Sequence, residues 1–250
     1  MDAGVKGKVV LVTGGGRDVG RAITLAYAGE GATVAVNYNS SAQEAEAVAT
    51  EAKAAGGDAR AYQSDVADNE SVKRMVAAVM KDFGRIDVLV NNAGYTKRQR
   101  FVDTTPDDWK KQIDVGLYGV IHTCHAVLPH MVKQGSGRII NFAGDSARVG
   151  ENGLAVTAAS RGGVLALTKS LAREVGRANV TVNAITLGLI ETPHDQAWVD
   201  ENRDKLVRLY PMRRLGKTSD VAPMVLFLGS EQASWITGQI ISVNGGFSMV

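Results

Sequence analysis

Short apolar runs recur along the chain, each bounded by glycine or polar residues, and amphipathic stretches lie between them. Seven of these runs are too short for helices and predict buried strands. They cover residues 8–12, 33–38, 59–63, 86–90, 137–142, 180–185 and 240–243. Between the runs, apolar side chains recur at helical spacing, as in Val72, Met75, Val76, Val79 and Phe83. The helices predicted in this way cover residues 20–31, 42–55, 72–83, 109–133, 156–175 and 221–228.

Strands that alternate with helices indicate right-handed βαβ units, in which helices cover both faces of a parallel sheet. No proline- or serine-rich linker divides the chain, and the sequence contains no repeat or low-complexity tract. The pattern therefore predicts one α/β domain over residues 1–250, built on a Rossmann-type doubly wound parallel sheet.

Composition narrows the class of protein. Of 250 residues, 45% are apolar and 22% charged, as in an average soluble globular protein. The net charge of +2 argues against a nucleic-acid binder driven by bulk charge, and the single cysteine, Cys124, excludes an intrachain disulfide framework. The chain opens without a signal-peptide pattern, and no apolar run approaches the roughly 18 residues of a membrane span. We expect a soluble cytoplasmic protein that binds neither membrane nor nucleic acid.

A glycine-rich segment, residues 13–20, separates the first predicted strand from the first predicted helix. Glycines at this place permit a tight turn and close approach of the backbone to a pyrophosphate, and the helix N-terminus offers free N–H groups. Asp65 ends the third predicted strand, and residues 91–94 follow the fourth. Ligands bind beyond the carboxyl ends of parallel strands, so these segments predict a dinucleotide site.

Together these motifs resemble the short-chain dehydrogenase/reductase family. Residues 137–141, 182–184, 192–193 and 244–246 extend the resemblance over essentially the whole chain. The resemblance implies a nicotinamide dinucleotide with its pyrophosphate at Gly14 and Gly20. The cofactor positions that it implies are Gly14, Gly16, Val19, Gly20, Asp65, Val66, Asn91, Ala93, Gly94, Arg161, Gly188, Ile190 and Thr192. We add Arg17, Asn37 and Ser40 as cofactor-binding residues near the adenosine ribose. Two positions depart from the family pattern: Asp18 replaces the middle glycine of the turn, and Leu187 replaces a proline.

The end of the second predicted strand bears on the choice of cofactor. NAD-binding sites usually place an acidic residue there to bind the ribose 2′-hydroxyl. Here the strand ends with Val36, Asn37 and Tyr38, so no carboxylate would repel a 2′-phosphate. Arg17 lies in the glycine turn, and Ser40 could add a hydroxyl donor. We therefore predict NADP(H) in preference to NAD(H).

The resemblance also implies that the usual catalytic side chains are replaced. The family's asparagine, serine, tyrosine and lysine correspond here to Gly116, Gly144, Thr157 and Arg161. No tyrosine occurs near position 157 and no lysine between 133 and 169, so the replacement does not depend on alignment detail. A threonine hydroxyl is a far weaker acid than a phenol. Arginine stays protonated, although it can stabilise an oxyanion or bind a carboxylate.

Three hypotheses about function follow. The first is an NADP(H)-dependent oxidoreductase with substitute groups, in which Thr157, Arg161, Asp145 and Tyr95 are the candidate catalytic residues. The second is a non-redox reaction on the same scaffold, such as a dehydration, an aldol cleavage or a cyclisation. The third is an inactive subunit that supports an active relative. Product formation without a change in nicotinamide absorbance would distinguish the second hypothesis from the first.

Several peripheral features add expectations about partners. Basic residues near the site mouth would attract an anionic substrate, such as a carboxylate or an acyl thioester; these are Lys97, Arg98, Arg100, Arg148, Arg213 and Arg214. Residues 190–214 resemble the segment that closes over the substrate in the family, and we expect a mobile lid there. The resemblance implies a homotetramer, or a hetero-oligomer with an active relative, through the helices over 109–133 and 156–175. The histidine spacing predicts no metal site.

Overall fold

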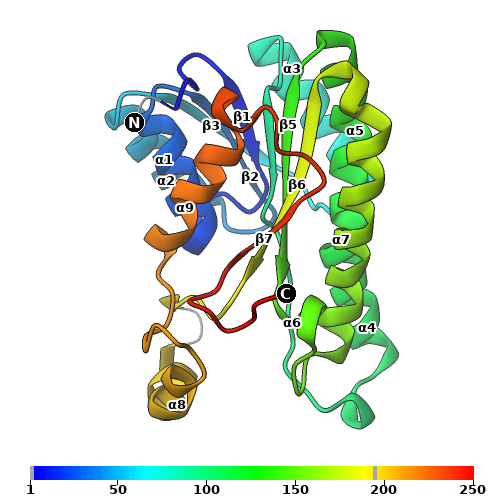
Figure 1. The fold of residues 1–250 in the computed structure, drawn as a ribbon. Coiled ribbons are helices and arrows are strands. Elements are labelled where there is room, and N and C mark those ends of the chain that lie inside the picture. The colour runs from blue at the N-terminus through cyan, green and yellow to red at the C-terminus, as the bar shows by residue number, and fades with distance from the viewer. Residues whose placement is uncertain (1–2, 194–195) are drawn as a thin grey trace.

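The computed structural model describes residues 3–193 and 196–250. Within them, seven strands form one parallel sheet in the order β3-β2-β1-β4-β5-β6-β7 (Figure 1). The strands are β1 (Val9–Val12), β2 (Thr33–Tyr38), β3 (Asp58–Gln63), β4 (Val88–Asn91), β5 (Gly137–Gly144), β6 (Val180–Leu187) and β7 (Ile240–Val243). The chain winds outward from β1 to β3 and then returns to continue from β4 to β7. This order confirms the predicted doubly wound Rossmann-type fold.

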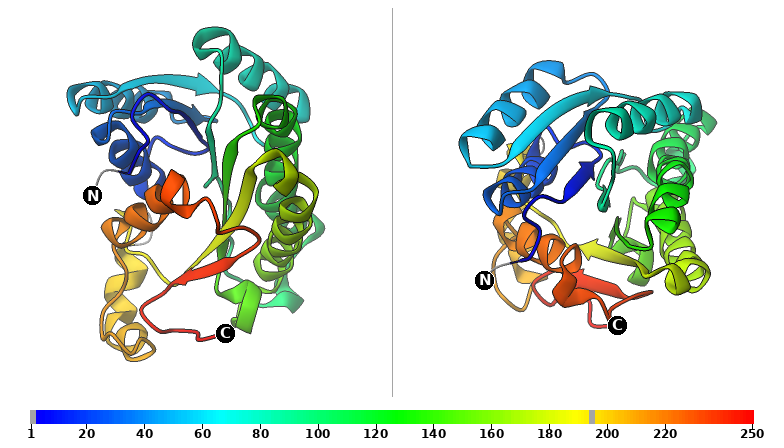
Figure 2. Two further views of the ribbon diagram at one scale, coloured as in Figure 1. Left: turned by 45° about the horizontal axis from the view of Figure 1, so that its top comes forward. Right: turned by 90° about the horizontal axis from the view of Figure 1, so that it is seen from above.

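Helices cover both faces of the sheet, as the pattern predicted. One layer contains α1 (Asp18–Gly29), α2 (Ala42–Ala54) and α9 (Thr218–Leu228), and the other contains α3 (Asn69–Phe83), α5 (Gly119–Gln134) and α7 (Ala155–Val175) (Figure 1, Figure 2). Each layer buries its own apolar cluster against the sheet. Because both faces are covered, the central strands are buried along their whole length.

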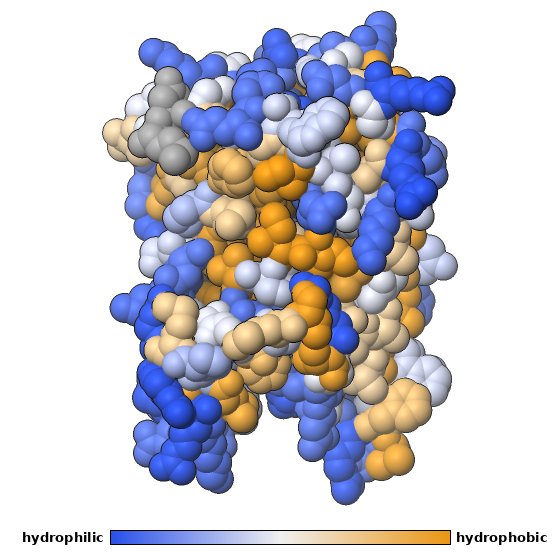
Figure 3. All heavy atoms as spheres, viewed as in Figure 1, coloured by the Kyte–Doolittle hydropathy of each residue, from blue (hydrophilic) through white to orange (hydrophobic). Residues whose placement is uncertain are grey.

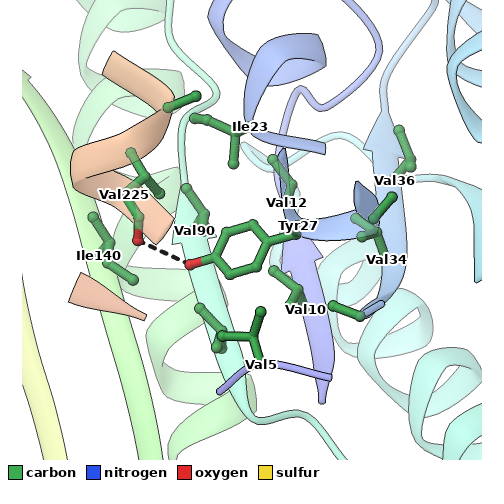
Figure 4. Packing of buried hydrophobic residues seen from close by; sticks show 14 of the residues in the cluster. Val5, Val10, Val12, Ile23, Tyr27, Val34, Val36, Val90, Ile140 and Val225 are labelled. Atoms are coloured by element: carbon green, nitrogen blue, oxygen red, sulfur yellow. Dashed lines mark hydrogen bonds between the residues drawn. The ribbon is translucent and has the colours of Figure 1, made fainter. Parts of the chain in front are cut away.

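Tyr27 shows how the first layer is held. Its ring is fully buried among valines of the central strands, including Val10, Val12 and Val34 (Figure 4). Its hydroxyl donates a 2.9 Å hydrogen bond to the carbonyl oxygen of Val225 in α9. The bond joins α1 to α9 and satisfies a polar group that would otherwise be buried at a cost of several kcal/mol.

The helix predicted over residues 109–133 is confirmed, and it is longer than predicted. It comprises α4 (Pro106–Ile113), a π-helical turn (Asp114–Tyr118) and α5. The helix starts earlier than predicted because Thr105 and Asp108 form a capping box and Pro106 stands in the first turn. The π-helical turn contains Gly116, and such turns often mark functional sites.

Other boundaries differ by a few residues. The strands β5 and β6 run to Gly144 and Leu187, beyond the predicted ends, because they stay paired in register over their whole length. The first helix begins at Asp18 rather than at residue 20, because the extended backbone of Arg17 already serves as its N-cap. These extensions lengthen the carboxyl edge of the sheet, where the site is expected.

Three short elements surround that edge. In Figure 1, α8 (Gln196–Arg208) lies on one side of the lower end, and α4 and α6 (Ser146–Val149) lie on the other. Figure 3 shows the molecule hollowed between these two projections and shows apolar residues gathered across the middle of the face, where β7 forms the edge of the sheet. Among the helices of the described residues, none is long and apolar enough to cross a bilayer.

Candidate active site

A cleft of about 220 Å³ opens at the carboxyl ends of β5 and β6. Its lining includes Gly144, Asp145, Thr157 and Arg161, which the sequence had singled out. The remaining residues are mostly apolar: Thr96, Arg98, Ala143, Ser146, Glu151, Leu154, Leu187, Gly188, Leu189, Trp198, Leu206, Leu209, Tyr210 and Phe247. The structure therefore brings three of the four candidate catalytic residues to one cleft. Tyr95, the fourth, is absent from this lining and packs its ring against Lys111, with Nζ 4.2 Å from the ring centroid.

The glycine turn is built as a cradle. Gly14 has a φ of +62°, which only glycine adopts at little cost. Gly20 stands so close to Gly14 that a Cβ at position 20 would overlap the Gly14 carbonyl. The Asn92 side-chain amide donates to the carbonyl oxygens of Thr13 and Gly14, at 3.0 and 3.1 Å. Sequence reasoning missed Asn92 as a site residue, although it lies inside the 91–94 motif.

The N-terminus of α1 is free to bind an anion. Its N-cap, Arg17, makes no side-chain capping bond, so the N–H groups of the first turn, which includes Val19 and Gly20, lack intrahelical acceptors. Such N–H groups together with the helix dipole fit a pyrophosphate. Asp18 stands in the same turn with a left-handed φ of +49°, and its carboxylate lies 4.0 Å from Nε of Arg17. Both Arg17 and Ser40 are exposed.

Asn37 lies beneath the turn rather than at the surface. It is 2% exposed, accepts a 3.2 Å hydrogen bond from the Gly14 N–H and donates one of 3.0 Å to the carbonyl oxygen of Ser64. Its side chain thus ties the glycine turn to the end of β3. Just beyond, an Asp65 carboxylate oxygen accepts from the Ala67 N–H at 2.9 Å, which shapes the loop that carries Val66.

The segment after β4 is held by a buried amide chain. Asn91 donates a 2.8 Å hydrogen bond to Asn141 Oδ1 and accepts one of 2.7 Å from the Thr123 hydroxyl. The Ala93 N–H donates to the Thr13 hydroxyl at 3.0 Å. These bonds fix the backbone of 91–94 beside the glycine turn, so Asn91 acts here by positioning its neighbours rather than by facing solvent.

Arg161 is the buried cation of the cleft. It lies on α7, is 9% exposed and donates from Nη1 to the carbonyl oxygen of Phe142 at 2.8 Å. The guanidinium fits because Gly94 lacks a side chain, since a Cβ there would overlap Nη2. Burial lowers the pKa of Arg161 to about 10, which leaves the group protonated at neutral pH.

Thr157 is hydrogen-bonded within the protein. Its hydroxyl donates to Gln112 Oε1 at 2.6 Å, and the Ser160 hydroxyl donates to the Gln112 carbonyl oxygen at 3.2 Å. Gln112 is 2% exposed and was not among the expected site residues, because nothing in the sequence marks it as a partner of position 157. At Gly144 the nearest obstacle to a Cβ is the Ser146 hydroxyl at 3.4 Å, an ordinary contact, so that position has room for a small side chain.

Asp145 is buried, and its carboxylate accepts hydrogen bonds from Asn244 Nδ2 and, at 3.4 Å, from the Ser242 hydroxyl. It therefore anchors the segment that follows β7. Tyr210 also lines the cleft, and its hydroxyl accepts from the Leu189 N–H at 2.8 Å. Burial is the main cause that raises the pKa of Tyr210. Sequence reasoning missed Tyr210 because it lies far from position 157 along the chain.

Four of the six basic residues near the mouth are neutralised by carboxylates. Lys97 pairs with Asp108 at 2.7 Å, Arg98 with Glu151 at 2.5 Å, Arg100 with Asp103 at 2.7 Å and Arg214 with Asp220 at 2.6 Å. The other two donate to neutral oxygens: Arg148 to the Ser242 hydroxyl at 3.0 Å and Arg213 to the Arg208 carbonyl oxygen at 3.3 Å. The expected anion-attracting patch is therefore largely paired.

The expected lid includes α8. Trp198, Leu206 and Leu209 cover the cleft, and the guanidinium of Arg98 lies 5.5 Å from the Trp198 ring centroid. Residues 194–195, within the expected lid, lie outside the described part of the chain. On the loop before them, Gly188 N–H donates to the Val243 carbonyl oxygen at 3.3 Å, and Ile190 bridges to Gly216. Thr192 follows on this loop, half-buried.

Comparisons with known proteins agree on the class. A family model described as "Enoyl-(Acyl carrier protein) reductase" matches residues 14–248. The chain is 43% identical over 242 residues to 3-oxoacyl-[acyl-carrier-protein] reductase FabG of Staphylococcus aureus (strain Mu50), covering 97% of this chain and 98% of that one. The corresponding protein of Thermotoga maritima is 38% identical, with 97% and 98% covered. A solved short-chain type dehydrogenase/reductase from Mycobacterium marinum superimposes with a TM-score of 0.94 at 29% identity, covering 99% of this chain and 98% of that one.

Proposed function

Because this chain belongs to the short-chain dehydrogenase/reductase family of oxidoreductases, we propose that it binds NADP(H) and interconverts a carbonyl and an alcohol. The observation that carries the proposal is the cradle made by the glycine turn and the uncapped first turn of α1. When bound, the nicotinamide supplies or accepts the hydride. Arg17 and Ser40, both exposed beside the cradle, would meet the 2′-phosphate.

The second part of the proposal is a non-standard active site. Gly116, Gly144, Thr157 and Arg161 take the places of the family's asparagine, serine, tyrosine and lysine. The hydroxyl proton of Thr157 is already donated to Gln112, which makes it a poor proton source for a substrate. Arg161 would bind a negatively charged group of the substrate.

A proton donor must then come from elsewhere. Among the described residues that line the cleft, Tyr210 is the one tyrosine. Its oxygen accepts from the Leu189 N–H, so its own proton remains available for a substrate. Asp145 and Tyr95 stay as alternatives, but the Asp145 carboxylate already accepts two hydrogen bonds and Tyr95 packs against Lys111.

The proposal is tested first by titrating the protein with NADPH and NADH and following nicotinamide fluorescence. We expect NADPH to bind more tightly than NADH. Arg17→Gln should weaken the binding of NADPH and leave the binding of NADH unchanged. Gly20→Ala should abolish binding of both, because its Cβ would meet the Gly14 carbonyl. Gly176→Ala is the matched control, since no atom lies within 4 Å of its added Cβ.

Turnover is then measured on carbonyl substrates by nicotinamide absorbance. Oxidation of NADPH in step with product would support the proposal. Product without a change in absorbance would favour a non-redox reaction on this scaffold. Failure to bind either dinucleotide would refute the proposal and favour an inactive subunit of a hetero-oligomer.

We also propose that the chain self-associates as a tetramer through the surface formed by α4, the π-helical turn and α5. Three large apolar side chains there are exposed, namely Trp109 at 37%, Tyr118 at 49% and Val132 at 46%. The proposed partner copies would cover these side chains. Light scattering on wild type and Tyr118→Glu should show a tetramer that the substitution dissociates, and a monomeric wild type would refute it.

A further inference from the structure

Arg161 carries a charge that no carboxylate within the described residues neutralises. Of its donors only Nη1 has a protein partner there, the carbonyl oxygen of Phe142. No ion pair within 4.0 Å involves it among the described residues. An isolated charge in a buried place is costly unless a partner compensates it.

The free donors form one edge of the guanidinium. Nε and Nη2 point the same way, and this edge binds a carboxylate through two parallel hydrogen bonds. Nη2 lies against the backbone of Gly94, where a Cβ would overlap it. Because Arg161 also lines the cleft, a ligand that enters the cleft can supply the missing anion.

We propose that the cleft binds a free carboxylic acid, with its carboxylate on the Nε–Nη2 edge of Arg161 and an apolar body against the lid. The proposal names the substrate class of the proposed oxidoreductase and rests on that function. The walls fit such a body, because they include Leu154, Leu206, Leu209 and Phe247.

The acidic side chains of the cleft, Asp145 and Glu151, already have other partners. The Asp145 carboxylate is hydrogen-bonded by Ser242 and Asn244, and Glu151 pairs with Arg98. Four of the six rim cations are paired with carboxylates, so an acidic carrier protein would find few free cations at the mouth. These features favour a small free acid over a carrier-bound thioester, which has no carboxylate for Arg161.

Calorimetric titration with hexanoate and hexanamide tests the proposal. The two probes share an apolar body and differ in charge. We expect wild type to bind hexanoate about 10- to 100-fold more tightly, as a charge-assisted bidentate pair provides. Arg161→Gln should remove that preference while leaving hexanamide affinity unchanged. Arg173→Gln, an exposed change of the same kind on α7, should keep the preference.

Equal affinity of wild type for both probes would overturn the proposal, and this result needs no variant to fold. A preference that survives in Arg161→Gln would also overturn it. Arg161→Lys keeps the positive charge but loses the planar guanidinium that makes two parallel hydrogen bonds. The preference for hexanoate over hexanamide should therefore fall without vanishing. If NADP+ displaces hexanoate, Arg161 belongs to the cofactor site and the proposal is overturned. Because dinucleotide binding is measured separately by fluorescence, its failure would refute the proposed function without deciding the hexanoate result.

Discussion

The hydrogen bond between Thr157 and Gln112 should stabilise the fold, and removing either partner should destabilise it. Thr157→Val replaces the hydroxyl by a methyl of nearly equal size, so packing is preserved. Gln112 Oε1 then keeps only a long contact of 3.5 Å with the Lys97 N–H. Since Gln112 is 2% exposed, water cannot easily replace the lost donor.

The magnitude follows from the burial of that oxygen. A buried acceptor left without its donor costs about 1–3 kcal/mol of unfolding free energy. For a chain of this length, each kcal/mol lowers the melting temperature by roughly 2–4 °C. In the double variant Thr157→Val with Gln112→Met, neither polar partner remains. The unfolding free energy that the double variant loses should be smaller than the sum of the losses in the two single variants by about 0.5–3 kcal/mol.

The assay is urea unfolding of the four proteins followed by circular dichroism, with Thr50→Val as control. Thr50 is exposed on α2 and bonds only to the carbonyl oxygen of Glu46, so its change should lie within about 0.5 kcal/mol. If Thr157→Val matched wild type within this margin, or if the two losses simply added, the reasoning would be refuted. Unchanged stability with lost turnover would instead make Thr157 a catalytic group.

Three further predictions concern neighbouring features. Asp18→Gly should tighten NADPH binding about tenfold, because it removes a carboxylate that would repel the pyrophosphate at the N-terminus of α1; weaker binding would contradict this. Tyr210→Phe should lower stability by about 1–3 kcal/mol by orphaning a backbone N–H and should lower turnover, whereas Tyr95→Phe should change neither; equal effects would contradict the contrast. The Arg214 guanidinium lowers the pKa of Asp220 to about 2. The stabilisation of the fold by this pair should therefore be complete above about pH 4 and lost as the pH falls towards 2. Unfolding of wild type and Asp220→Asn over a pH series should show a difference in unfolding free energy under about 1 kcal/mol that vanishes in acid.

The fold could be predicted from the sequence because each element carries a local signal. The apolar runs of the strands and the 3.6-residue spacing of the helices are set by burial against one sheet, and they predict the alternation without any long-range information. The π-helical turn within the long helix could not be predicted in the same way. Its π-helical turn depends on how Gly116 packs, and a Cβ there would lie 2.6 Å from the Ser160 hydroxyl on α7.

The residues of the candidate site also differ in whether the sequence alone predicts their roles. Motifs that act through their own backbone, such as the glycine turn, can be recognised in sequence because glycine itself is the requirement. Side chains that act through a hydrogen-bond partner elsewhere in the chain cannot be recognised in this way. Asn37 appeared to be a cofactor contact, yet its amide is used to fix Gly14 and Ser64 from below. Pairing at 2.6 Å between Thr157 and Gln112 joins residues 45 positions apart, for which the sequence carries no periodic signal.

The replacements around Arg161 make better sense as a set than singly. The guanidinium of Arg161 needs space, and the neighbouring position 94 is glycine, so the space exists. The hydroxyl of Thr157 turns to Gln112 instead of towards a substrate, so position 157 no longer competes for the ligand's oxygen. The carbonyl oxygen of Phe142 takes one end of the guanidinium and leaves the other edge free. A binding site for an anion accounts for the free donors of Arg161, which the loss of a proton relay alone does not explain.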